Sequence, residues 1–294
     1  MTSLLFFQMT SWFEVLNKGF GARSERINDP LAVTIFCIGP LGVAYVNFPV
    51  GIRTSEAMRS IMQPETRQTL KKMGADILRF SVPESLAQGE GNYGLSLPET
   101  CIINLADWSE QGLDSDVRYK TRRARREGIQ TRPIRVSDAS FMYELYRLTV
   151  NRHEGRLRYT PRYFSAICNL LESSQDVYGL IAETPEQKPC GFIVTARADD
   201  TTYYLHGGFD PANANNRPGY VLMCAAIKLA RDNGCVRFNL MSSPENQPTL
   251  VRFKEKWGGQ TQPLFNLDIP ISKFGQIAHL GLRVRQRLSC RRRD

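Results

Sequence analysis

The sequence contains little histidine and has no paired-cysteine motif. Its three histidines are widely spaced and its seven cysteines include no C-x-x-C pair, so we expect neither a catalytic metal cluster nor a structural zinc site. An odd number of scattered cysteines does not resemble a disulfide framework and favours a reducing cytoplasm. A G-x-S-x-G elbow is also missing, which argues against a hydrolase with a Ser/His/Asp triad.

Long uninterrupted apolar runs are scarce as well. The longest candidate, residues 31–50, is broken by Gly39-Pro40, with β-branched residues on both sides, and this pattern predicts a buried hairpin or strand pair rather than a membrane span. The segment MTSLLFFQMTSWF has no basic lead-in and no small-residue cleavage pattern. We therefore expect no secretory signal.

The overall composition is that of an ordinary globular protein, with 42% hydrophobic and 23% charged residues among 294. This length predicts two domains, with one large domain as the alternative. The formal net charge of +9 favours anionic partners such as nucleic acid, phosphorylated substrates or acidic lipid headgroups. Charge alone does not choose among them.

Hydrophobic periodicity predicts a mixed α/β protein. In the first half we expect helices over residues 11–20, 55–62 and 65–73, and strands over 32–38, 42–48, 76–82 and 100–105. In the second half we expect helices over residues 114–127, 137–152, 163–172 and 218–232, and strands over 177–183, 190–198, 203–206 and 236–241. No internal repeat indicates a duplication.

The stretch 203–258 carries most of the functional information. A β-prone run is expected to end at His206, because Gly207, Gly208 and the following Asp-Pro favour a turn. Asn216 is the expected cap of the next helix, with Pro218 in its first turn. A strand, a helix and a second strand of this length imply a βαβ unit.

The start of that helix is a candidate anion site. Helix N-termini bind phosphate or carboxylate, and Arg217 adds a full charge beside the Gly219 backbone. The alternative is that Asn216 and Pro218 only begin a helix and that Arg217 is solvated. We also include Tyr204, from the preceding strand, among the donor- or substrate-binding candidates.

Several motifs occur in an order that resembles a known family. YYLHGGFD, RPGYVLMCAAIKLARDNG, FNLMSS and FKEKWGG are similar to the C-terminal half of FemAB-like proteins. This branch of the GNAT acyltransferase superfamily includes peptidoglycan-bridge aminoacyltransferases and CelD-like acyltransferases. Upstream, VRYKTRRARREGIQTRPI resembles the basic helix that links the two halves in that family, and the resemblance covers roughly residues 105–265.

The resemblance implies two GNAT-like lobes in tandem. The first lobe would cover residues 1–133 and end in the basic linking helix. The second would cover residues 134–272 and contain the active site. Residues 273–294 would form a basic tail.

The implied function is transfer of an aminoacyl group from aminoacyl-tRNA to an amine, by direct aminolysis and without a permanently bound cofactor. The acceptor would be a peptide, a cell-wall precursor or a small biosynthetic intermediate. NNRPGY stands where an acetyl-CoA enzyme has its R/Q-x-x-G-x-G/A loop, which puts ordinary CoA pyrophosphate binding in doubt, and the positive charge favours tRNA. The alternatives are an acyl-CoA or acyl-carrier-protein donor, and a non-catalytic module that binds RNA or a precursor.

Three residues are candidates for catalysis. His206 and Asp210 are predicted proton acceptors, because strand ends beside a βα crossover commonly face a binding crevice. Each is equally a good turn residue. Lys254 of FKEKWGG resembles the lysine of the family's F-K motif, which implies phosphate binding or stabilisation of negative charge. An exposed helical lysine is the alternative.

Further candidates for substrate or donor binding are polar or cationic. Ser242, Ser243 and Asn246 follow a strand end and are interpreted either as hydrogen-bond donors or as loop filling. Arg118, Arg122 and Arg125 recur at helical spacing and predict a face that binds phosphates or is merely solvated. Arg152 completes this set.

The last residues, LGLRVRQRLSCRRRD, concentrate arginines. A basic tail of this type contacts nucleic acid or an anionic membrane surface, or is a solvated end.

Overall fold

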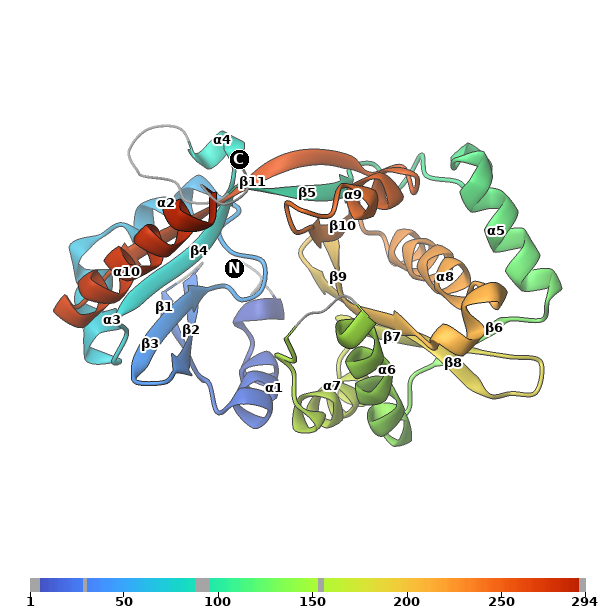
Figure 1. Ribbon diagram of the computed structural model, residues 1–294, viewed down its shortest axis with the longest axis horizontal. Coiled ribbons are helices and arrows are strands. Elements are labelled where there is room, and N and C mark those ends of the chain that lie inside the picture. The colour runs from blue at the N-terminus through green and yellow to red at the C-terminus, as the bar shows by residue number, and fades with distance from the viewer. Residues whose placement is uncertain (1–5, 29–30, 88–95, 153–155, 291–294) are drawn as a thin grey trace.

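The computed structural model describes residues 6–28, 31–87, 96–152 and 156–290, with side chains up to residue 281. One mixed sheet of 11 strands runs through the protein in the order β1-β2-β3-β4-β11-β5-β10-β9-β8-β7-β6. Its two halves lie side by side, and β11 and β5 connect them (Figure 1). The predicted α/β class is confirmed.

The N-terminal half of the sheet consists of β1 (Arg23–Asn28), β2 (Leu31–Ile38), β3 (Leu41–Val46) and β4 (Ile77–Pro83). β2 and β3 form the predicted antiparallel hairpin, with Ile38 opposite Leu41. Buried side chains from α2 (Ser55–Ile61), α3 (Pro64–Lys72) and α4 (Glu84–Ala87) share an apolar core with these strands. The helix pair flanking Pro64 agrees with the prediction.

The C-terminal half contains β5 (Ser96–Ile102), β6 (Gln130–Pro133), β7 (Val177–Glu183), β8 (Pro189–Ala198), β9 (Thr201–Phe209) and β10 (Arg237–Ser242). Helices α6 (Ala139–Arg152) and α7 (Pro161–Ser173) pack in one core, while α5 (Ser115–Arg126) and α8 (Pro218–Asp232) pack in another. α9 (Pro248–Glu255) follows β10. The predicted bounds of α8 are confirmed.

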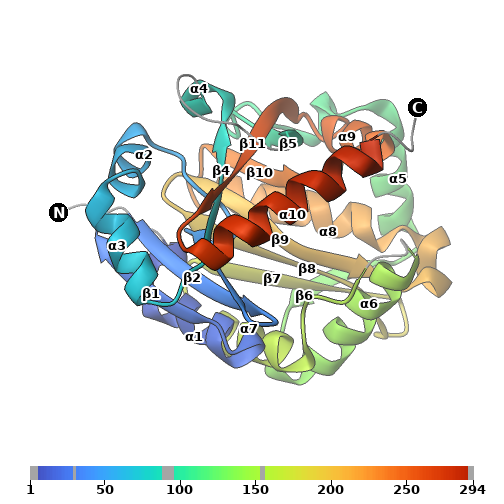
Figure 2. The same cartoon turned by 60° about the vertical axis from the view of Figure 1, so that its left-hand side comes forward.

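Both ends of the chain pack with the half that is distant in sequence. α1 (Thr10–Phe20) lies on α7, where the Thr160 hydroxyl donates to the Gly19 carbonyl at 2.8 Å. A Cβ at Gly19 would lie 2.8 Å from the Tyr163 Cβ, so glycine permits this close approach. β11 (Gln260–Pro270) lies between β4 and β5, and α10 (Lys273–Cys290) packs on the N-terminal half (Figure 2). The predicted domain boundaries remain a prediction.

Some local expectations were wrong. β9 does not stop at His206, because Gly207 and Gly208 pair with β8 as strand residues. The N-cap of α8 is Arg217 rather than Asn216. Sequence reasoning also missed β1, β6 and β11, whose polar or proline-containing segments lack a clear alternation. Short 3₁₀ helices are η1 (Phe6–Gln8), η2 (Glu110–Gly112), η3 (Val136–Asp138) and η4 (Pro211–Asn216).

The predicted basic tail is largely helical, since α10 reaches Cys290. Residues 291–293, which carry three of its arginines, lie outside the described residues, as do the side chains of Arg283, Arg285 and Arg287. Among the helices that are described, none has the length and apolar character needed to cross a bilayer.

Candidate active site

Strands β9 and β10 separate soon after they pair. Parallel pairing ends with Asn239 opposite Tyr203. β9 then continues to Phe209, whereas β10 pairs with β5, with Ser242 opposite Glu99. Backbone N–H and C=O groups along this edge of β9, beyond Tyr203, are therefore not paired with β10 and can bond to an extended ligand.

β9 contains a β-bulge just after its pairing with β10 ends. Tyr204 pairs with Thr195 and His206 with Val194, which leaves Leu205 as the extra residue. A Cβ on Gly207 would lie 2.2 Å from the Tyr204 hydroxyl, so Tyr204 and Gly207 share a side of the strand. The absence of a side chain at position 207 makes room for the Tyr204 ring.

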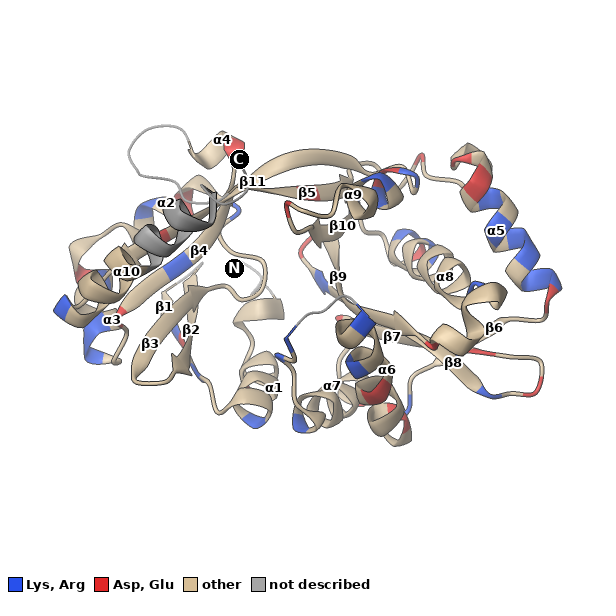
Figure 3. Cartoon of the chain, in the orientation of Figure 1, with Lys and Arg blue, Asp and Glu red and all other residues tan. Residues whose placement is uncertain are grey.

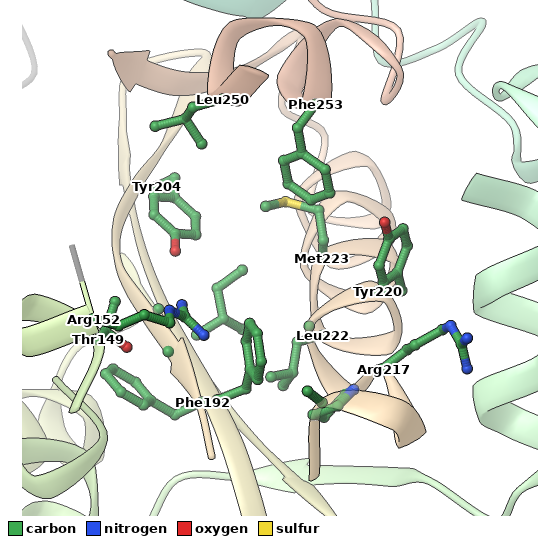
Figure 4. A pocket seen from close by; sticks show the side chains of 17 residues that line it. Thr149, Arg152, Phe192, Tyr204, Arg217, Tyr220, Leu222, Met223, Leu250 and Phe253 are labelled. Carbon is green, nitrogen blue, oxygen red and sulfur yellow. The ribbon is translucent and has the colours of Figure 1, made fainter. Parts of the chain in front are cut away.

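A cavity of about 400 Å³ opens between β9 and α8 (Figure 4). We call it the β9–α8 cavity. Its lining is mostly apolar and comes from β8, β9, η4, α8 and α9, with polar residues from α6 and from the N-cap of α8: Thr149, Arg152, Phe192, Ile193, Tyr204, Gly207, Gly208, Phe209, Ala214, Arg217, Pro218, Gly219, Tyr220, Leu222, Met223, Leu250 and Phe253. The Thr149 hydroxyl oxygen is buried and has no hydrogen-bond partner within the described chain. It is a candidate ligand contact that the sequence analysis did not single out.

Two predicted cations lie at this cavity. The Arg152 guanidinium lies 4.8 Å from the centroid of the Phe209 ring, a cation–π contact. Arg217 adopts a left-handed conformation with φ 54°, and its Nη1 donates to the Asn215 carbonyl at 2.5 Å. Its guanidinium extends outward from the cavity (Figure 4), which makes it suited to the more distant, anionic part of a ligand.

The first turn of α8 offers few backbone donors. The Arg217 N–H bonds to the Ala214 carbonyl, the Tyr220 N–H bonds to the Arg217 carbonyl, and Pro218 has no N–H. Among these described residues, only Gly219 can present an N–H to a ligand. A pyrophosphate cradle uses several N–H groups at a helix start, so this turn fits such a group poorly.

Lys254 lies beneath the end of β10. Its side chain is buried, and Nζ donates to the carbonyls of Met241 at 2.8 Å and Ser242 at 3.1 Å. Burial lowers the pKa of Lys254 to about 8. The exposed-lysine alternative is therefore wrong, and the ammonium group positions the backbone where β9 and β10 separate.

The end of β10 has an unusual backbone. Met241 has a φ of 63°, which is uncommon for a side chain of this size. Its N–H donates to the Asn239 side chain at 2.7 Å, and the Lys254 bonds hold the following carbonyls. The Ser243 hydroxyl is buried without a hydrogen-bond partner in the described structure, so it can donate to a ligand.

A second opening lies on the other side of β10. Two adjoining hollows of about 470 and 260 Å³ share Arg158 and Ser242. We call them together the central groove. Its polar lining includes the predicted residues Ser242, Ser243 and Asn246, and the unpredicted residues Tyr45, Arg53, Arg79, Glu99, Arg158 and Asn266.

Two arginines of the central groove are held by carboxylates. Arg53 and Glu99 form a bidentate pair at 2.7 and 2.8 Å, and Arg79 and Asp268 pair at 2.6 Å through both oxygens. Arg158 is exposed and has no ion-pair partner among the described residues. Its charge is consequently free for an anionic ligand. The sequence reading missed these residues because they are far apart along the chain.

His206 and Asp210 are not arranged as proton acceptors. His206 Nε2 and the Tyr163 hydroxyl are 2.7 Å apart, and the imidazole ring packs edge-on against Tyr159 and Tyr163. Burial lowers the pKa of His206 to about 3, too low for an efficient base near neutral pH. Asp210 caps η4 by accepting from the Ala212 N–H at 2.9 Å. The turn interpretation of Asp210 therefore fits, while His206 is a packing residue within a strand.

The basic helix α5 is only partly free to bind phosphates. Arg125 forms a bidentate pair with Glu110 at 2.6 and 3.0 Å. Arg118 and Arg122 line a shallow hollow and have no ion-pair partner among the described residues. Figure 3 shows that basic residues follow one another along α5. The predicted cationic face thus depends on Arg118 and Arg122, and Arg125 contributes less.

Comparison with a protein-family model gives a match over residues 115–255, described as an acetyltransferase (GNAT) domain. Residues 115–255 are thus similar to a GNAT acetyltransferase domain. The matched segment runs from α5 to α9 and contains both β9 and β10. The match agrees with the predicted type of enzyme, a transferase. Among curated proteins, none matches its sequence.

Solved structures with the same fold extend beyond the matched domain. A structure of FemX has a TM-score of 0.64 at 13% identity and covers 89% of this chain and 91% of its own. The C-terminal domain of a putative lysylphosphatidylglycerol synthetase from Agrobacterium fabrum has a TM-score of 0.62 at 13% identity, with coverages of 94% and 92%. L-PGS from Bacillus licheniformis has a TM-score of 0.60 at 12% identity, with coverages of 93% and 95%. The predicted FemAB-like fold is confirmed, and it includes the N-terminal half.

Proposed function

We propose that this protein transfers an aminoacyl group from aminoacyl-tRNA to an amine. The observation that carries the proposal is the separation of β9 and β10 between two unlike openings. Tyr204, which follows the last pair on β9, lines the β9–α8 cavity, and Met241 and Ser242 line the central groove. A donor in the cavity and an acceptor in the groove would approach one another at this point.

Cations around the cavity support an aminoacyl-tRNA donor. Arg152 and Arg217 lie at the cavity, and Arg118 and Arg122 add charge on α5, which packs on α8. The 3′ end of tRNA carries phosphates spaced along its backbone, which scattered arginines can contact. The single N–H offered at the start of α8 does not favour a compact pyrophosphate. The similarity in fold to a putative lysylphosphatidylglycerol synthetase is consistent with an aminoacyl group as cargo.

The chemistry follows from ordinary aminolysis of an ester. The neutral amine attacks the ester carbonyl, a C–N bond forms, the bond from carbon to ribose oxygen breaks, and the proton of the amine ends on the ribose hydroxyl. The free edge of β9 can hold the donor extended, and the Ser243 hydroxyl is a candidate donor to the developing oxyanion. Lys254 acts as a positioning residue, since its ammonium contacts two carbonyls.

Arg158 indicates the type of acceptor. Arg158 lines both hollows of the central groove, and the charges of Arg53 and Arg79 are already matched by Glu99 and Asp268. A phosphate or carboxylate on the acceptor would pair with Arg158. We therefore propose an acceptor that carries an anionic group as well as the amine.

A second candidate donor is an acyl thioester on CoA or on a carrier protein. The apolar lining of the β9–α8 cavity and the free edge of β9 favour it, because a pantetheine arm and an acyl chain could occupy both. A non-catalytic module that binds RNA or a precursor is the third possibility. The first candidate consumes aminoacyl-tRNA, the second consumes an acyl thioester, and the binding module consumes neither.

The deciding experiment follows donor consumption by the purified protein. A mixed aminoacyl-tRNA pool, acetyl-CoA and longer acyl-CoAs are each supplied with pooled anionic amines, and every reaction is repeated without acceptor. We expect deacylation of tRNA that requires acceptor. Thioester consumption in its place would establish the second candidate, and binding of RNA without turnover of any donor would contradict the enzyme proposal.

A matched pair of glycine variants tests whether the donor binds in the β9–α8 cavity. Gly207→Ala places a methyl group 2.2 Å from the Tyr204 hydroxyl, whereas Gly281→Ala on α10 meets nothing within 4 Å. We expect turnover to fall at least about tenfold in the first variant and to stay unchanged in the second. Circular dichroism of both variants distinguishes a blocked cavity from a misfolded chain.

A further inference from the structure

Helix α10 presents apolar side chains to solvent. Phe274 is 46% exposed, Ile277 is 72% exposed and Leu280 is 64% exposed. Their spacing of three residues places them along one side of the helix. The opposite side packs on the protein, since a Cβ on Gly275 would lie against the backbone carbonyl of Asp76. We call the three exposed residues the α10 ridge.

Basic residues stand at the N-terminal end of this ridge. Lys273 begins α10 and is exposed, and exposed Lys71 and Lys72 end α3. The loop after α3 is bonded to the segment before α10, because the Asp76 carbonyl accepts from the Ile271 N–H at 2.8 Å. Figures 2 and 3 show α3 beside the first turns of α10 and basic residues at that end. Beyond the ridge, the sequence continues with Arg283, Arg285 and Arg287.

The spacing of apolar residues also continues in the sequence beyond the ridge, at Val284 and Leu288. A helix that combines an exposed apolar side with flanking Lys and Arg is typical of segments that lie in the interface of a bilayer. The apolar side chains enter the headgroup region, while the cations are attracted to anionic lipids.

We propose that the α10 ridge docks this protein onto an anionic membrane surface. An RNA partner would use the cations but would leave Ile277 and Leu280 in water. A second copy of the chain would bring basic clusters of the same sign together, which disfavours association through this surface. A bilayer with acidic headgroups matches the apolar residues and the charge at once.

The test is co-sedimentation of the full-length protein with vesicles. We expect at least about tenfold tighter binding to vesicles of phosphatidylcholine with phosphatidylglycerol than to pure phosphatidylcholine. The variant I277Q/L280Q should lose about tenfold in affinity for the anionic vesicles, because two exposed apolar side chains no longer insert. Ile38→Gln, at a residue 56% exposed on the β2–β3 hairpin, is the matched control and should bind as the unchanged protein does.

Other outcomes would overturn the proposal. Equal binding to both vesicle types, or retention of binding by I277Q/L280Q, would show that the α10 ridge does not recognise an anionic bilayer. A monomer–dimer equilibrium that I277Q/L280Q abolishes, without vesicle binding, would assign the ridge to a second copy. Loss of tRNA binding in that variant, again without vesicle binding, would assign it to RNA. No donor is consumed in these measurements, so their result is independent of the proposed transfer reaction.

Discussion

The β9–α8 cavity and the central groove lie on either side of the same strand separation, yet their walls are built differently. The cavity has an apolar lining, and Arg152 and Arg217 lie at it without ion-pair partners among the described residues. The groove has a polar lining in which Arg53 and Arg79 are fixed by carboxylates. Arginines that look alike in sequence therefore have different roles. The two at the cavity are free to bind a ligand, whereas the two in the groove are held in ion pairs within the protein.

The contrast also concerns hydroxyl groups. Each opening contains one buried hydroxyl without a partner in the described structure, Thr149 in the cavity and Ser243 in the groove. Buried polar groups normally have a hydrogen-bond partner. These two are accordingly the places where a bound ligand would complete the structure.

The largest expected effect is on the free energy of unfolding and comes from removing an ion pair of the central groove. Glu99→Ala leaves the partly buried Arg53 without its bidentate partner, and we expect a loss of about 3 kcal/mol in the free energy of unfolding. Urea denaturation measures it. Arg152→Met, which removes a cation–π contact at the cavity, should cost less than about 1 kcal/mol. Equal losses would show that the arginines of the two openings are not distinct in role.

A second prediction concerns pH and the lysine between the two openings. The pKa of Lys254 is lowered to about 8 in the folded state, so above that value the unfolded chain binds more protons than the folded one. The free energy of unfolding should therefore rise with pH, relative to Lys254→Met, by about 2 kcal/mol between about pH 7 and pH 9.5. Denaturant titrations over this range measure the difference.

Lys256→Met is the control for that measurement. Lys256 is partly exposed and pairs with Asp116, whose hydrogen bond raises the pKa of Lys256, so the same comparison should show no rise with pH. If the difference in free energy of unfolding between the unchanged protein and Lys254→Met also stayed constant with pH, the burial of the charged lysine would be contradicted.

The smallest expected effects are on KM, and they distinguish the arginine that binds the donor from the arginine that binds the acceptor. Arg217→Gln should raise KM for the donor by about five- to tenfold and reduce the salt dependence of donor binding by about one counterion. Arg158→Gln should instead raise KM for the acceptor and leave that salt dependence unchanged. Steady-state kinetics at several salt concentrations measure both. If the two variants exchanged their effects, the assignment of cavity and groove would have to be reversed.

Much of the fold could be predicted from local patterns. The apolar stripe from Val221 to Leu229 and the proline at position 218 predicted α8 with its observed bounds, and Gly39-Pro40 predicted the β2–β3 hairpin. β11 was missed because prolines and polar residues interrupt its alternation. β9 was cut short because glycines usually end strands, whereas here Gly207 makes room for Tyr204.

Several predicted site residues lie together in the structure, and their roles stay predictions. Tyr204, Arg152, Arg217 and Gly219 line one cavity, and Ser242, Ser243 and Asn246 line the groove. His206 was misread, because an aromatic run followed by glycines gives no sign that the imidazole packs among rings of α7 and the preceding loop.

The sequence by itself determined the helices of residues 115–255, most of the strands there, and the cationic character of the protein. The helices and strands depend on neighbours within a few positions, which set periodicity, capping and turns. Resemblance to the F-K motif pointed to Lys254. Only the tertiary structure decided which arginines are neutralised and where the groove lies. Asp268 meets Arg79 across the β4–β11 pair, Glu99 of β5 binds Arg53, and Arg158 lines the same groove from a loop. Such proximity between distant segments leaves no local pattern in the sequence.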